Sequence, residues 1–217
     1  MSLPYRNRRE AGQVLAELVR ELPAGDSVVL GLPRGGVPVA FEVARAIGAP
    51  LDIFVVRKLG VPGHEELAMG AIASGGMCVL NDDVVDSLRI SPEAIAAAVR
   101  SETIELRRRE ELYRDGRPPV DVRGKRAILV DDGLATGASM RAAVAALRGL
   151  GPAEIVVAVP VAAAESCEDF RHEVDFCICA ATPEPLYGVG LWFRDFRPTS
   201  DDEVRALLAL VPEEVRL

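Results

Sequence analysis

The chain has 217 residues, of which 49% are hydrophobic, and it carries a formal net charge of −8 at pH 7. This length and apolar content can bury the core of one α/β domain, residues 1–217, but not of two. The negative charge argues against nucleic acid as a partner, because such binding depends on clustered Lys and Arg side chains. No apolar run approaches membrane-spanning length, and the amino end lacks the hydrophobic segment of a secretory signal. We therefore expect a cytoplasmic protein that binds neither DNA nor a membrane.

The first predicted element is a strand over residues 28–30, which runs into the turn LPRGG and a helix from about Val37. Gly35 and Gly36 free the backbone to point N–H groups inward, and the Arg34 guanidinium offers several donors in one plane. The segment therefore predicts a loop that binds an anion rich in oxygen, such as pyrophosphate. The alternative is a surface arginine in a tight turn.

A second strand is predicted over residues 51–56, and Arg57 and Lys58 follow it directly. Lys58 is one of two lysines in a chain that otherwise uses arginine for its cations. Two adjacent cations at the carboxyl end of a strand suit an anionic ligand. Chance placement is the alternative.

Residues 60–76, GVPGHEELAMGAIASGG, carry glycines at both ends and in the middle and show no persistent helical or alternating pattern. This composition is typical of a mobile loop, which we expect over about 58–77 as a lid on a bound ligand. HEELA lacks the second histidine of a HExxH zinc site. Glu65 and Glu66 are either solvated loop charges or candidates to handle a proton once the lid closes, and the sequence does not choose between the two residues.

The rest of the chain alternates helices with strands. A long helix begins at Ser91-Pro92-Glu93 and runs to about Tyr113, with charges spaced for ion pairs on a solvated face. Further strands are predicted over 128–130, 155–159 and 176–180, and further helices over 138–148, 162–170 and 201–210. This alternation predicts an α/β fold, a single domain with a central mainly parallel sheet flanked by helices.

The four cysteines show no paired CxxC spacing of the kind that binds zinc. Cys177 and Cys179 lie two residues apart in an apolar run, the spacing of one strand face. We expect the side chains of Cys78, Cys167, Cys177 and Cys179 to pack in the core.

The richest motif is ILVDDGLATGASM, residues 128–140. Its apolar run predicts a buried strand whose carboxyl end delivers Asp131 and Asp132 into a crevice, where vicinal hydroxyls of a ribose or a divalent cation would satisfy them. The loop that follows opens a helix, so its N–H groups and the helix dipole favour one phosphate. An ordinary strand-to-helix turn is the alternative. The loop residues are Gly133, Leu134, Ala135, Thr136, Gly137, Ala138 and Ser139.

These segments resemble the type I phosphoribosyltransferase family. Residues 128–140 are similar to its motif for 5-phosphoribosyl 1-pyrophosphate (PRPP), LPRGG to its pyrophosphate loop, and Arg57-Lys58 to the start of its mobile loop in adenine-type members. The resemblance implies that Asp131 and Asp132 hold the ribose hydroxyls and that residues 133–139 cradle the 5-phosphate. It also implies a cis peptide bond near Pro33–Arg34.

The implied reaction transfers the phosphoribosyl group of PRPP to a nitrogenous base, with Mg²⁺ as cofactor and pyrophosphate as product, as in nucleotide salvage. Arg34, Arg57 and Lys58 would stabilise the leaving pyrophosphate. Asp131 and Asp132 would stabilise positive charge on the ribose and are the candidate metal ligands, through the ribose or water. Hypoxanthine-guanine members carry an acid at the position of Ala135, so this chain departs from their pattern.

Residues 182–198 concentrate Tyr187, Trp192, Phe193 and Phe196 in a chain that is only 5% aromatic. The resemblance implies a small C-terminal hood here, whose rings would stack on the small heterocyclic base. Packing of the last helix and an oligomer interface are alternatives, and the family suggests a homodimer only weakly.

A rival function is a PRPP-sensing regulatory protein without turnover. A regulator that reads DNA needs a binding surface, but only about 25 residues precede the first strand and no basic face is evident. A nucleotide-binding domain of unrelated chemistry is a third possibility, although neither a GxGxxG turn nor a Walker A string is present.

Overall fold

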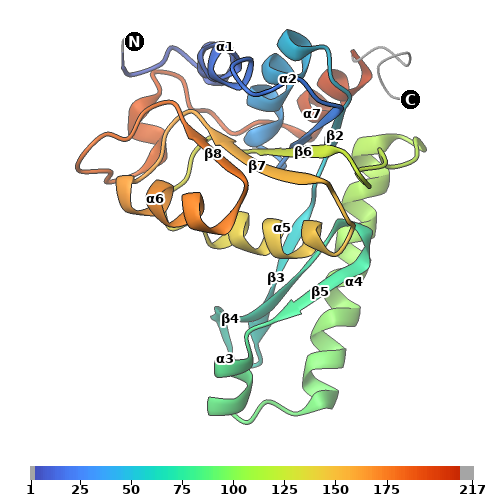
Figure 1. The fold of residues 1–217 in the computed structure, drawn as a ribbon. Coiled ribbons are helices and arrows are strands. Elements are labelled where there is room, and N and C mark those ends of the chain that lie inside the picture. Colours follow the sequence, from blue (N-terminus) through green and yellow to red (C-terminus); the bar gives the residue numbers. More distant parts are fainter. Residues whose placement is uncertain (1–2, 211–217) are drawn as a thin grey trace.

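The main sheet contains five parallel strands in the order β2-β1-β6-β7-β8 (Figure 1). The computed structural model describes residues 3–210, apart from the side chains of Glu65 and Glu66. The prediction of an α/β fold with a central parallel sheet is confirmed. The strands are β1 Ser27–Gly31, β2 Leu51–Ile53, β6 Arg126–Val130, β7 Glu154–Val159 and β8 Phe176–Cys179.

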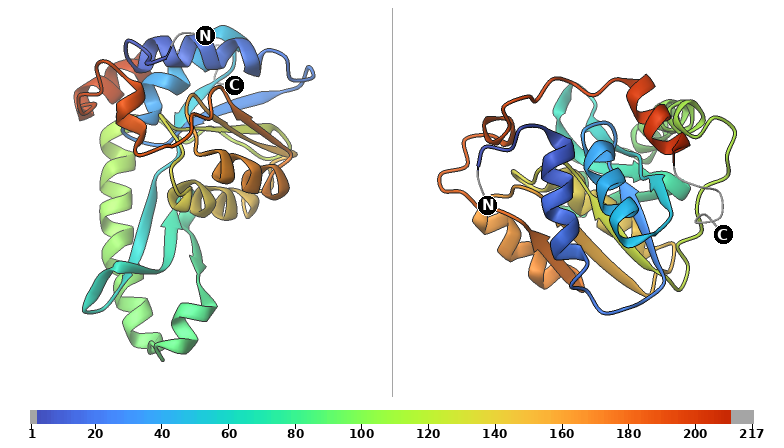
Figure 2. Two further views of the ribbon diagram at one scale, coloured as in Figure 1. Left: turned by 90° about the vertical axis from the view of Figure 1, so that its left-hand side faces the viewer. Right: turned by 90° about the horizontal axis from the view of Figure 1, so that it is seen from above.

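Helices cover both faces of this sheet, with α1 and α2 side by side on one face and α5 and α6 on the other (Figures 1 and 2). The inner strand β6 is buried on both faces, which explains why its residues 127–130 are all apolar, whereas the edge strand β8 is half-buried. Among the helices that the structure describes, none combines the length and apolar character that crossing a membrane requires. The bounds are α1 Arg8–Val19, α2 Gly36–Ile47, α5 Ala138–Arg148, α6 Ala164–Glu173 and α7 Asp201–Ala209.

Three neighbouring strands end at the same edge of the sheet. Gly31 at the end of β1 pairs in register with Ile53 of β2 on one side and with Val130 of β6 on the other. In a parallel sheet, the loops that follow such strands share one crevice. The fold therefore brings the LPRGG loop and the loop after β6 together, as the motifs require.

A second, antiparallel sheet of three strands, β3-β4-β5, extends from the main sheet together with α4 (Figures 1 and 2). We call this part the arm, residues 56–114. It contains β3 Val56–Val61, β4 His64–Ala73, the 3₁₀ turn η1 Ser74–Gly76, β5 Met77–Leu80, α3 Asp82–Ser87 and α4 Pro92–Arg114.

The arm corrects two sequence predictions. The predicted strand over 51–56 ends at Ile53, and Val56 begins the separate strand β3. The expected loop over 58–77 is mostly a hairpin, with its turn between Val61 and His64. Glycines interrupt the apolar alternation that identifies strands, so periodicity was a poor guide here. The movement of this segment as a lid stays a prediction.

The prediction that all four cysteine side chains pack in the core is only partly correct. Cys167 is buried, but its sulfur forms a disulfide with Cys179, while Cys78 is exposed and Cys177 is half-buried. The sequence did not indicate this bond, because the spacing of the cysteines does not show that Cys167 on α6 faces Cys179 on the next element, β8. The expectation for Cys78 was wrong, since β5 turns this side chain away from the arm's interior.

Helix α4 anchors the arm to the main sheet through a buried ion pair. The Arg114 Nε donates to both carboxylate oxygens of Asp52, at 3.0 and 3.1 Å, and the backbone N–H of Val120 donates to the same carboxylate. Both side chains are largely buried. Because Asp52 lies on β2, this contact fixes the end of α4 against the strand from which the arm departs.

The Asp52→Asn variant should lose about 1.5–3 kcal/mol of unfolding free energy, because it removes the charge that accepts the hydrogen bonds of Arg114 and Val120, while Arg114 keeps its ion pair with Glu110 at 3.0 Å. Chemical denaturation of the purified chain measures this loss. The matched control is Glu17→Gln, which breaks the solvent-exposed pair with Arg20 and should change stability little. Equal effects of the two variants would contradict an anchoring role for Asp52.

Candidate functional site

The centre of the site is the acid pair, Asp131 and Asp132, at the carboxyl end of β6. The strand before the pair is fully buried, so the carboxylates emerge directly from the core into the crevice. The Asp131 Oδ1 accepts a hydrogen bond from the backbone N–H of Asp132 at 2.8 Å. The Asp132 Oδ2 accepts one from the Nε of Arg8, also at 2.8 Å. Two adjacent carboxylates thus share one cation of the protein.

This arrangement disfavours two negative charges at once. Burial, and then the charge of Asp132, raise the pKa of Asp131 well above the usual range of a carboxyl. Burial also raises the pKa of Asp132, although the guanidinium of Arg8 acts in the opposite direction. The pair is therefore short of positive charge and of hydrogen-bond donors, both of which a cation or a hydroxylated ligand supplies.

The LPRGG loop packs directly on the acid pair. A Cβ atom on Gly35 would lie 2.0 Å from the Oδ2 of Asp132, and one on Gly36 would lie 2.5 Å from the carbonyl oxygen of Val130. Only glycine allows the loop to approach this closely. The expected cis peptide bond between Pro33 and Arg34 is confirmed.

The Arg34 side chain is free to meet a ligand. The side chain is 49% exposed, and its ion-pair partner among the described residues is Asp201, at 3.8 Å. That distance is long for a charge-assisted hydrogen bond. The loop predicted around Arg34 therefore lies beside the acid pair, and its arginine makes a weak contact that a ligand could replace. The expectation that the N–H of Gly36 points to the anion was wrong, because it donates to the carbonyl oxygen of Leu32 at 3.0 Å.

The loop after β6 is held by Val161, which follows β7, and by Ser166 of α6. The backbone N–H of Leu134 donates to the carbonyl oxygen of Val161 at 2.8 Å, and the Oγ of Ser166 donates to the carbonyl oxygen of Ala135 at 2.5 Å. Leu134 is also buried. Because the N–H of Leu134 already donates to Val161, it stabilises the loop and is not available to a phosphate.

The remaining N–H groups of this loop point to an anion site. Gly137 has a positive φ of 75° and caps α5, so Ala138 and Ser139 occupy its first turn. Within the described part of the chain, no acceptor pairs with the backbone N–H groups of residues 135–139. Free N–H groups at a helix start attract an anion. The side chains of Thr136 and Ser139 are exposed beside them.

The structure separates the remaining candidates from the acid pair. Arg57 lies on β3 and pairs with Glu102 of α4 at 2.7 Å, while Lys58 is exposed. Among the described residues, no hydrogen bond or ion pair joins either cation to Asp131 or Asp132. Glu65 and Glu66 belong to β4, and their side chains lie outside the described part of the structure.

Arg8 is a site residue that the sequence did not reveal. It lies 124 positions before Asp132, and its guanidinium also stacks on the ring of Phe196 at 3.9 Å. Its Nη1 donates to the carbonyl oxygen of Arg197 at 2.8 Å. The amino-terminal segment and the region 182–198 therefore meet over the acid pair. The basic run RNRRE was the only available indication, and basic runs are usually solvated.

The aromatic residues of region 182–198 have different roles. Phe193 is buried and packs against Tyr5 and Phe196, with ring centroids 5.7 and 4.9 Å away. These rings form a small core between the two chain ends. Tyr187 is 85% exposed and is the ring most open to a ligand. The segment runs around the amino-terminal end of the chain to α7 (Figure 2).

Comparison with known proteins agrees with this geometry. A family model described as the phosphoribosyl transferase domain matches residues 6–88 and 93–187. A Mycobacterium tuberculosis protein, named provisionally as a phosphoribosyl transferase, is 48% identical over 204 residues, which are 94% of this chain and 46% of that protein. The chain thus spans about half the length of the curated relatives it matches. The crystal structure of TT1426 from Thermus thermophilus is 41% identical, with a TM-score of 0.84 and coverage of 95% of this chain and 98% of that one.

The acid pair gives a stability prediction. Asp131→Asn and Asp132→Asn each remove the repulsion between the carboxylates, but only Asp132→Asn removes the charge that Arg8 contacts. Asp131→Asn should therefore be the more stable variant by about 1.5–3 kcal/mol, the contribution of a charge-assisted hydrogen bond. It should also exceed the wild-type chain in stability. Urea unfolding near neutral pH without metal measures both differences, and a less stable Asp131→Asn variant would contradict the assigned repulsion.

Proposed function

The chain belongs to the phosphoribosyl transferase family. We propose that it transfers the phosphoribosyl group of PRPP to a nitrogenous base and releases pyrophosphate. The observation that carries the proposal is the packing of Gly35 on Asp132 and of Gly36 on the end of β6. This contact puts a loop suited to pyrophosphate beside carboxylates suited to a ribose. PRPP carries its pyrophosphate on the anomeric carbon of the ribose and its two vicinal hydroxyls on the neighbouring carbons.

The acid pair is the proposed ribose clamp. An ionised carboxylate only accepts hydrogen bonds, and the two vicinal hydroxyls of the ribose both donate. Asp131 has no side-chain donor among the described residues, whereas Arg8 already donates to Asp132. We therefore assign the stronger ribose contact to Asp131. The 5-phosphate then meets the free N–H groups of residues 135–139 at the start of α5.

Carboxylate oxygens of the acid pair also fit Mg²⁺, a hard cation that prefers oxygen ligands and retains several waters. Asp131 is the better candidate, because Arg8 occupies one oxygen of Asp132. When bound, the ion would neutralise charge on the phosphate oxygens of the donor. The shortage of positive charge at the pair is consistent with this assignment.

The reaction exchanges one bond at the anomeric carbon. The bond from this carbon to the pyrophosphate oxygen breaks with its electron pair, and a nitrogen of the base forms the new bond. Arg34 would stabilise the charge that develops on the pyrophosphate, while Asp131 and Asp132 would stabilise the positive charge on the ribose. Lys58 is a further cation for the leaving group if the arm moves toward the crevice.

Region 182–198 and the hairpin of the arm would complete the site around the acid pair. A base bound under the region 182–198 would meet the exposed ring of Tyr187, which offers a surface for stacking. Glu65 or Glu66 would take the proton of the base after closure of the hairpin. An acceptor of this class would place the reaction in nucleotide salvage.

The proposed activity predicts pyrophosphate release from PRPP and Mg²⁺ that depends on one acceptor from a panel of purines, pyrimidines and nicotinate-like bases. Calorimetry with PRPP alone measures donor binding in parallel. Tight donor binding without release for any base would favour the PRPP-sensing alternative. Failure to bind the donor would refute both.

The clamp assignment predicts a selective loss of affinity. The double variant Asp131→Asn, Asp132→Asn should bind PRPP at least tenfold more weakly, as expected when charged hydrogen bonds are lost, but should bind free pyrophosphate almost normally. Calorimetry with both ligands makes the comparison. Equal losses for the two ligands would rule out a specific ribose contact.

The pyrophosphate loop gives the converse prediction. Arg34→Ala should weaken pyrophosphate binding by roughly 10–100-fold, since it removes a charged donor. The matched control is Arg20→Ala, because Arg20 is also 49% exposed but lies at the end of α1, where its guanidinium bonds to the end of α2. Unchanged pyrophosphate affinity in Arg34→Ala would make Arg34 an ordinary surface residue.

A further inference from the structure

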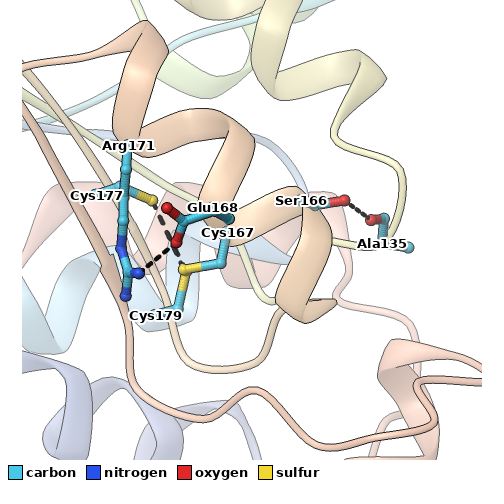
Figure 3. Close-up of a disulfide and its surroundings, with 7 residues drawn as sticks. All are labelled: Ala135, Ser166, Cys167, Glu168, Arg171, Cys177 and Cys179. Carbon is cyan, nitrogen blue, oxygen red and sulfur yellow. Dashed lines mark hydrogen bonds and ion pairs between the residues drawn. A yellow bond between two sulfur atoms is a disulfide. The ribbon is translucent and has the colours of Figure 1, made fainter.

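Three of the four cysteines meet between α6 and β8, outside the proposed site (Figure 3). Cys167 lies on α6, and Cys177 and Cys179 lie on β8. Cys167 and Cys179 form a disulfide, while Cys177 retains a free thiol. We call these residues the sulfur cluster. The proposed transfer reaction gives none of them a role.

The positions around Cys177 match a tetrahedral metal centre. Its Sγ lies 4.0 Å from the Sγ of Cys167 and 3.8 Å from that of Cys179. Zinc–sulfur bonds are about 2.3 Å long, so two thiolates at corners of a tetrahedron lie about 3.8 Å apart. Two of the three sulfur–sulfur distances that such a centre requires are therefore already present. Reduction of the disulfide allows the third edge to open, because unbonded sulfur atoms separate to a similar distance.

We propose that the reduced protein binds one Zn²⁺ ion through the thiolates of Cys167, Cys177 and Cys179, and that the disulfide is the metal-free alternative of the same cluster. A dithiol reductant supplies two electrons and two protons, which convert the disulfide into two thiols, and is itself oxidised to a disulfide. Zn²⁺ then replaces three thiol protons, which pass to solvent.

The surroundings of the cluster suit a metal thiolate. Glu168 and Arg171 lie beside the sulfur atoms and form an ion pair at 2.6 Å (Figure 3). Three thiolates and Zn²⁺ carry one net negative charge, which the Arg171 guanidinium can stabilise. Cys177 and Cys179 are half-buried, so the fourth corner is open to a water molecule or to the Glu168 carboxylate.

Cys177 is the member of the sulfur cluster that the disulfide leaves unbonded. A bound metal displaces a thiol proton outright. Sulfur ligands also select Zn²⁺ over Mg²⁺, whereas the oxygen ligands of Asp131 and Asp132 favour Mg²⁺. The two sites should therefore be loaded independently.

The test is a titration of the full chain with Co²⁺, a spectroscopic probe for zinc sites, after reduction and removal of the reductant. The reduced chain should bind one equivalent with the intense near-ultraviolet absorption of cobalt–thiolate bonds, and Zn²⁺ should displace it. The disulfide form should show no such absorption. Zn²⁺ should also raise the melting temperature of the reduced chain and protect its thiols from oxidation.

Cys177→Ser is the decisive variant, because it removes one ligand but leaves the disulfide pair intact. Even outer-shell partners of metal sites contribute about 10–100-fold to affinity, so loss of a ligand should weaken Co²⁺ binding by at least that factor. The control is Cys78→Ser, which removes the exposed cysteine on β5 and should bind Co²⁺ as the wild-type chain does. Absence of cobalt–thiolate absorption in the reduced wild-type chain, or equal affinity in Cys177→Ser, would overturn the proposal.

Discussion

Two adjacent carboxylates at the end of a buried strand are the constraint on which the rest of the site depends. Burial of β6 forces Asp131 and Asp132 into one crevice, and Arg8 is the cation that the described chain supplies to them. This arrangement costs stability, because two acids in a low-dielectric site repel each other. A ligand that brings hydrogen-bond donors or positive charge would offset this repulsion. The cost in stability therefore falls where the proposed substrate binds.

Arg8 connects this constraint to the outer parts of the fold. One guanidinium contacts the Asp132 carboxylate, the Phe196 ring and the Arg197 carbonyl oxygen. The amino-terminal segment and region 182–198 are therefore ordered around the same charge that the acid pair requires. A ligand that alters the charge of the acid pair would change the strength of the contact between Arg8 and Asp132. It would therefore also affect the amino-terminal segment and region 182–198, which Arg8 holds over the pair.

The sequence predicted what is local. Helix α5 begins and ends where expected, and the strands β1, β6 and β7 agree closely with the apolar runs, because a buried parallel strand needs only a short continuous run of such residues. The cis bond at Pro33–Arg34 followed from family resemblance alone. Long-range contacts were invisible to this reasoning: Arg8 with Asp132, and Cys167 with Cys179. The hairpin of the arm was missed because its glycines hide the alternation.

The sulfur cluster and the loop after β6, residues 133–139, share one support, the first turn of α6. Ser166 donates from its Oγ to the carbonyl oxygen of Ala135, and the next residue, Cys167, joins α6 to β8 (Figure 3). A disulfide and a zinc centre would each tether α6 at this point, whereas three free thiols would not. The disulfide and the proposed zinc centre would therefore both hold Ser166 in place, and with it residues 133–139, so the proposed redox change at the cluster need not disturb the proposed phosphate site.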